Sequence, residues 1–135
     1  MKKIVPIIIC IISCFVLLSC TKDDDNDNTT YQDDSRYYIK YEVSSKSVDR
    51  RNFDQTYTIK TEKGIETIKK TGSSSYSWEG TYGPFKKGEE VSLLVSSAYF
   101  NHAKISASRN QEPFVIKAEK DIENKEISLS YTIDF

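Results

Sequence analysis

Apolar and polar residues alternate along short segments through most of the chain after residue 36. The clearest series is at the C-terminus, where every second residue from Ile127 to Phe135 is aliphatic or aromatic. A period of two is expected of a β-strand that buries one face, and so long a series predicts a central strand. Shorter series with the same period predict further strands at 37–43, 57–59, 65–69, 76–82, 91–95, 105–107 and 114–118.

Turn residues separate these segments. The run 62–64, Glu-Lys-Gly, predicts a hairpin between 57–59 and 65–69. Gly83-Pro84 and the run 86–88 predict turns ahead of 91–95, and the polar run 101–104 predicts a loop. No segment has a helical period, so the pattern predicts an all-β fold. We expect an antiparallel, immunoglobulin-like β-sandwich of seven to eight strands over residues 37–135, with a closed barrel as the alternative.

The N-terminus has a different pattern, a continuous apolar run. Lys2 and Lys3 precede the apolar stretch 4–18, as in a secretion signal. The sequence Leu-Leu-Ser-Cys at 17–20 resembles the lipobox of bacterial lipoproteins, which implies that residues 1–19 are a cleaved signal peptide and that Cys20 is acylated with palmitate-like chains. The alternative is a retained transmembrane helix, but the fifteen residues 4–18 fall short of the roughly 20 that a span needs.

Residues 20–36 are expected to form the lipidated cysteine and a disordered acidic tether. The stretch 21–30 has no aliphatic or aromatic residue, so it cannot bury apolar surface to offset its ordering entropy. Asp23, Asp25 and Asp27 have calcium-loop spacing, but no apolar helix flanks them, which favours a solvated spacer. The run KDDD at 22–25 resembles the export signal of surface lipoproteins in Bacteroidetes. It implies a surface-exposed protein in the outer membrane, with the periplasmic leaflet as the alternative.

Charge argues against one class of partner. The chain has 19 basic and 20 acidic residues, and the predicted domain is nearly neutral. Without a clustered basic face, nucleic acid is not an expected partner. The expected partners are the membrane, through the lipid anchor, and a glycan or an envelope protein.

One block resembles a known family. Residues 81–93, TYGPFKKGEEVSL, resemble the aromatic strand, turn and following strand of small β-sandwich domains in MmpS-like and related lipoproteins. In layout the resemblance covers residues 37–135, although this chain lacks a cysteine pair in the domain. It implies the sandwich fold and an accessory or binding role at the cell envelope.

The residues for catalysis are sparse. His102 is the one histidine, so a site of several imidazoles is excluded and a catalytic triad would depend on this residue. No Gly-x-Ser-x-Gly elbow or phosphate-binding glycine loop is present, and Cys20 is the one cysteine of the mature chain. We therefore expect a non-enzymatic protein without metal or cofactor.

The aromatic residues supply the candidate binding positions. The chain has nine Tyr and one Trp, and such rings can stack on sugars. Trp78 is expected to fill the core, whereas Tyr38 lies on the polar face of its predicted strand. The candidate binding residues are Tyr38, Tyr99, Phe100 and His102. Two functions stay open, a surface binding module and a structural or protective envelope protein that associates with a transporter, pilus or toxin.

Overall fold

The fold consists of β-strands. The computed structural model describes residues 34–47, 53–71 and 74–135, and within them it contains six strands, no helix and antiparallel ladders throughout. This confirms the all-β, antiparallel class. The expected signal peptide, Cys20 and the tether up to residue 33 lie outside the described residues. The strands are β1 (Tyr37–Lys46), β2 (Asp54–Thr61), β3 (Gly64–Thr71), β4 (Ser75–Phe85), β5 (Glu90–Arg109) and β6 (Val115–Thr132).

The expected count of seven to eight strands is wrong, because two long strands each contain two of the predicted ones. β5 includes both 91–95 and 105–107, and β6 includes most of the segments predicted at 114–118 and 127–135. The run 101–104 that was predicted as a loop therefore lies inside β5. Gly83-Pro84, predicted as a turn, lies inside β4 beside a register shift opposite Tyr37 and Ile39.

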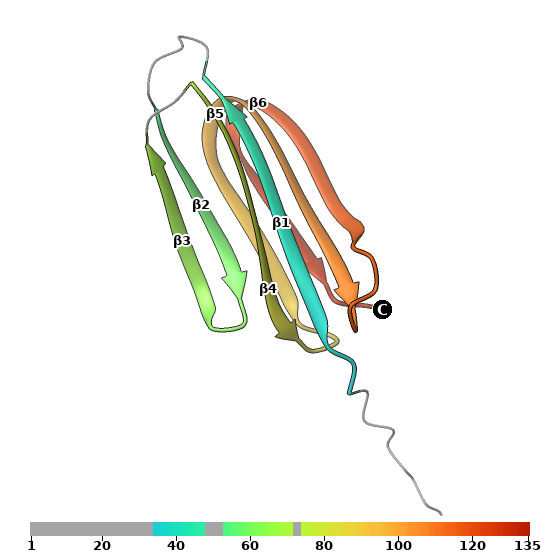
Figure 1. Ribbon diagram of the computed structural model, residues 1–135. Helices are drawn as coiled ribbons and strands as arrows, with labels where there is room; N and C mark the ends of the chain where they lie inside the picture. The colour runs from blue at the N-terminus through green and yellow to red at the C-terminus, as the bar shows by residue number, and fades with distance from the viewer. Residues whose placement is uncertain (1–33, 48–52, 72–73) are drawn as a thin grey trace, which may run out of the picture. The chain divides into compact units, whose positions relative to one another are not determined.

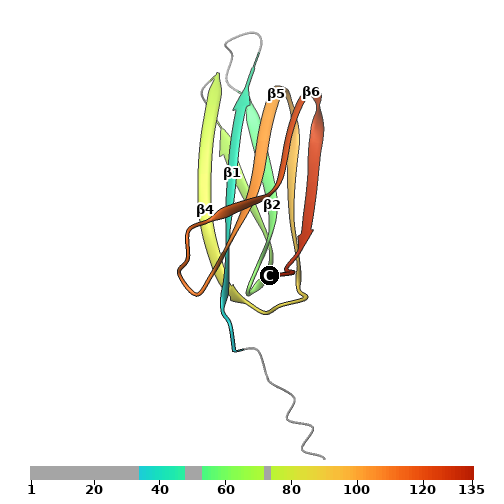
Figure 2. The same cartoon turned by 90° about the vertical axis from the view of Figure 1, so that its right-hand side faces the viewer.

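The bend in β5 creates two layers from one curled sheet (Figures 1 and 2). Residues 93–95 of β5 pair with β2, and residues 100–109 pair with β1. The β2 layer consists of β3, β2 and the parts of β5 and β6 that lie beside them. The β1 layer consists of β4, β1 and the remaining parts of β5 and β6. Across the described ranges, no ladder joins β3 to β4, so the sheet is an open sandwich-like arrangement rather than a closed barrel. The C-terminal strand β6 pairs with β5 alone in this part of the chain, so it is an edge strand and not the predicted central one.

The core lies between the layers. The Tyr57 ring of β2 stacks on the Trp78 ring of β4 with centroids 5.3 Å apart. The Tyr41 hydroxyl of β1 donates a hydrogen bond to the Lys60 carbonyl of β2 at 2.6 Å. Trp78 packs against the core, as predicted. The buried apolar residues are Tyr37, Ile39, Tyr41, Val43, Tyr57, Ile59, Phe85, Val91, Leu93, Val95, Ala103, Ile105, Ala107, Ile127 and Ile133.

A buried polar cluster stabilises the bend. The register of β5 against β6 shifts between Val95 and Ala98, which takes Ser96 out of the regular ladder. The Ser96 carbonyl accepts hydrogen bonds from the side-chain amides of Gln55, at 2.8 Å, and Asn101, at 3.0 Å. The strand can therefore bend while its freed backbone oxygen keeps partners, as a buried carbonyl must.

Candidate binding face

The solvent side of the β1 layer holds most of the candidate functional residues, and we call it the outer face. It arises from the period of two in β1, where every second residue from Tyr37 to Val43 is buried and those between them point outward. The ladder to β5 places Ser108 opposite Tyr38 and His102 opposite Ser44, on the same side of the sheet. The face includes Tyr38, Lys40, Glu42, Ser44, Ser77, Glu79, Thr81, Phe100, His102, Lys104, Ser108, Glu119 and Asp121.

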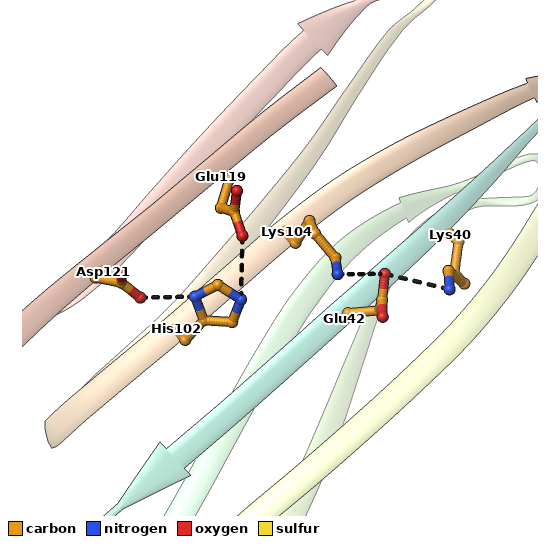
Figure 3. Close-up of polar contacts among 6 residues, drawn as sticks. All are labelled: Lys40, Glu42, His102, Lys104, Glu119 and Asp121. Atoms are coloured by element: carbon orange, nitrogen blue, oxygen red, sulfur yellow. Dashed lines mark hydrogen bonds and ion pairs between the residues drawn. The ribbon is translucent and has the colours of Figure 1, made fainter. Parts of the chain in front are cut away.

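An ion-pair network crosses the middle of the outer face (Figure 3). Glu42 Oε2 lies 3.1 Å from Lys104 Nζ and 3.3 Å from Lys40 Nζ. Partial burial acts to raise the pKa of the Glu42 carboxyl, but the hydrogen bonds and charges of the two lysines outweigh it and hold the pKa below its usual value. Because these charges satisfy one another, this part of the face offers little to a charged ligand.

His102 lies between two carboxylates from β6 (Figure 3). Its Nδ1 is 2.6 Å from Asp121 Oδ1, and its Nε2 is 3.4 Å from Glu119 Oε1. Both ring nitrogens face acidic side chains, so neither is directed at a serine hydroxyl as a triad requires. The geometry fits a surface ion-pair cluster better than a nucleophile and its base.

A polar depression of about 380 Å³ lies beside these ion pairs. Its small residues are Ser44 and Ser77, and its longer ones include Glu79, His102 and Lys104. Short serines between long charged side chains leave a hollow on an otherwise even strand surface.

A second depression, of about 350 Å³, has a different chemistry. Two aromatic side chains line it, Tyr38 from β1 and Phe114 from the segment before β6. Phe114 is 40% exposed, and the Lys40 ammonium lies 5.7 Å from its ring centroid. The remaining lining residues, all with polar side chains, are Thr81, Ser108, Gln111 and Glu112. We call this the aromatic depression.

The structure does not bring the four predicted binding residues into one site. Tyr38 lines the aromatic depression, and His102 lines the polar one. Since Ser108 lies opposite Tyr38, the six-residue separation of His102 from Ser108 along β5 corresponds to about 20 Å. Phe100 is farther away still, opposite Lys46, whose ammonium lies 5.9 Å from its ring. Tyr99 lies near the bend of β5, and its side chain is 45% exposed.

Sequence reasoning missed Phe114 and the turn residue Gln111 as residues of a site. We predicted an alternating strand with Phe114, Ile116 and Ala118 on one face, but a register shift places Ile116 opposite Ser106 while Ala118 stays opposite Ile105. A slip of one residue turns a side chain to the other face, which leaves Ile116 52% exposed. Asn110 and Pro113 are sequence signals that indicate a turn directly before Phe114.

Neither protein-family models, nor curated proteins, nor solved structures gave a match to this chain. Among residues 34–47, 53–71 and 74–135, no group of three or more His, Cys, Asp or Glu side chains is arranged to hold a metal ion. The same residues contain no helix that could span a membrane.

Proposed function

We propose that this chain is a lipid-anchored, non-catalytic binding module of the outer membrane that binds its ligand on the outer face of the β1 layer. The observation that carries the proposal is the aromatic depression, where Tyr38 and Phe114 meet the polar side chains of Thr81, Gln111 and Glu112. Ligand sites combine apolar walls with a few polar groups in this way. The lipid anchor at Cys20 and the surface location rest on the sequence of residues 1–25.

A crosslinking experiment tests which face binds. A photo-reactive amino acid at Thr81 probes the aromatic depression, and the matched control is Thr67, an exposed threonine on the solvent side of the β2 layer. On intact cells we expect adducts from the Thr81 probe and few from the Thr67 probe. Equal labelling of the two positions, or none, would contradict the assignment of the binding face.

The anchor needs its own test. Labelled palmitate should enter the wild-type chain and be lost with Cys20→Ala, because the thiol is the attachment point. Protease added to whole cells should degrade the wild-type domain if it faces outward and spare it if it faces the periplasm. Equal palmitate labelling of both chains would refute lipidation at Cys20.

The alternative function, a structural or protective protein within an envelope assembly, has a separate observation in its favour. β4 is an edge strand of eleven residues with a single charged side chain, Glu79. The other end of the sheet order, β3, carries Glu66, Lys69 and Lys70, which hinder pairing with another strand. An edge strand with so few charges can add a strand from a partner, so crosslinks along β4 to an envelope protein would favour this alternative.

A further inference from the structure

The turn that borders the aromatic depression holds a side chain in an unfavourable backbone conformation. Asn110 and Gln111 both have positive φ, 47° and 73°, at the hairpin between β5 and β6. Two consecutive left-handed residues form the turn whose twist suits a hairpin, and its second position is normally glycine. Asn tolerates this conformation, but Gln has no local hydrogen bond to offset the steric cost. Gln111 is therefore not the residue that the turn itself favours.

The turn is fixed in place. The Asn110 amide donates to the Arg36 carbonyl, and the Arg36 amide donates to Asn110 Oδ1, both at 2.9 Å. The Ser108 hydroxyl donates to the Glu112 carbonyl at 2.5 Å, which closes the turn from the other side. These bonds hold the backbone of the turn, including that of Gln111, in place without a ligand, which reduces the ordering cost of binding.

We propose that the aromatic depression is a sugar-binding site and that Gln111 is one of its specificity-determining residues. This inference rests on the proposed binding function and names its ligand class, a neutral pyranose unit of a longer glycan. Tyr38 and Phe114 offer ring surface to the apolar face of the sugar. The Gln111 amide can both donate to and accept from sugar hydroxyls.

The charge that lines the depression disfavours an acidic ligand. Glu112 is the one charged residue that lines the depression, and its carboxylate accepts hydrogen bonds from hydroxyls but repels an acidic sugar. Among the described residues, the side chains of Gln111 and Glu112 form no hydrogen bond or ion pair with another side chain. Their polar atoms are thus available to a ligand, in contrast to the mutually paired charges of Lys40, Glu42 and Lys104.

The test separates binding from folding. The full chain, purified in detergent, is titrated with cellohexaose, xylohexaose, mannohexaose and maltohexaose, and with hexagalacturonic acid as the acidic probe. At least one neutral hexasaccharide should bind, and Phe114→Ala should abolish the binding. Gln111→Gly should weaken it about tenfold, the effect of one lost hydrogen bond worth about 1.4 kcal/mol, while the urea midpoint of unfolding stays equal or rises.

Asn124→Gly is the matched control, because Asn124 also has positive φ, 56°, but does not line the depression. It should bind sugar like the wild type. The inference is overturned if no neutral hexasaccharide binds, if the acidic one binds best, or if Gln111→Gly lowers the urea midpoint or leaves affinity unchanged. In each case, adducts from the Thr81 probe on cells would still support a binding module for another ligand, whereas their absence would refute the binding module itself.

Discussion

Asn101 and His102 are neighbours in β5, yet their side chains lie on opposite sides of the sheet. We expect their contributions to the free energy of unfolding to be very different. Asn101 is fully buried and contacts four groups, the Ser96 and Lys125 carbonyls and the side chains of Ser45 and Gln55. His102 lies on the outer face between carboxylates that are 46% and 65% exposed. Solvent-exposed ion pairs contribute little to the stability of the fold, whereas a buried polar group that loses its partner lowers this stability considerably. The expected difference in stability between the two residues therefore comes from their burial and not from the number of their polar contacts.

The largest expected effect comes from Asn101→Ala. The substitution leaves the Ser96 carbonyl with a single side-chain donor and removes the acceptor of the Ser45 hydroxyl inside the protein. We expect a loss of about 3 kcal/mol in the free energy of unfolding, measured by urea denaturation, since each buried unsatisfied group costs about 1–3 kcal/mol. The control is His102→Ala, with an expected loss below about 1 kcal/mol. Similar losses for both variants would remove the distinction drawn between them.

A smaller effect is expected where a buried hydroxyl joins the layers. Tyr41→Phe removes the hydrogen bond to the Lys60 carbonyl and should cost about 1 kcal/mol near neutral pH. Burial, with the neighbouring Tyr82, raises the pKa of the Tyr41 hydroxyl far above its usual value. The unfolded chain therefore loses this proton first, so the contribution is present below about pH 10 and is lost as the pH rises beyond it. Urea midpoints between neutral and alkaline pH should fall less steeply for Tyr41→Phe, and parallel curves would contradict this assignment.

The smallest effect is expected from the ion pairs on the outer face. Glu42→Gln should cost about 0.5–1 kcal/mol near neutral pH, because the carboxylate is only partly buried. The lysines hold the folded-state pKa of Glu42 below that of the unfolded chain, so this contribution is present above about pH 4 and is lost as the pH falls through the folded-state value. The difference between wild type and variant should shrink in acid and in high salt. A difference that stays constant in both would show that the charges of Lys40 and Lys104 are not its cause.

The sequence predicted local features well and long-range ones poorly. The alternation from Tyr37 to Val43 predicted both the strand and its buried face, and the turn at 62–64 predicted the hairpin of β2 and β3. The pattern could not predict that 91–95 and 105–107 belong to one strand. A polar residue such as Asn101 predicts a loop when the sequence is considered alone, because the sequence does not reveal its buried partners in β1 and β2.

The candidate site was predictable only in part, for the same reason. Tyr38 follows from the period of two, because it is an aromatic residue at an outward position. Phe114 depends on a register shift between β5 and β6, which no local pattern encodes. Gln111 depends on a backbone conformation that its residue type disfavours. The lipid anchor, the surface location and the MmpS-like resemblance stay predictions.

The place where the chain enters the domain has a mechanical consequence. The backbone of Arg36 forms two hydrogen bonds with Asn110 in the 110–112 turn. Tyr38, two residues after Arg36, lines the aromatic depression. If the domain is tethered at Cys20 and holds a ligand at this depression, tension between membrane and ligand passes through Arg36, Tyr38 and the turn. This tension would not pass through the bent end of β5 or through most of the core. A pull on the bound ligand would then be resisted near the point of attachment, without stretching the domain along its length.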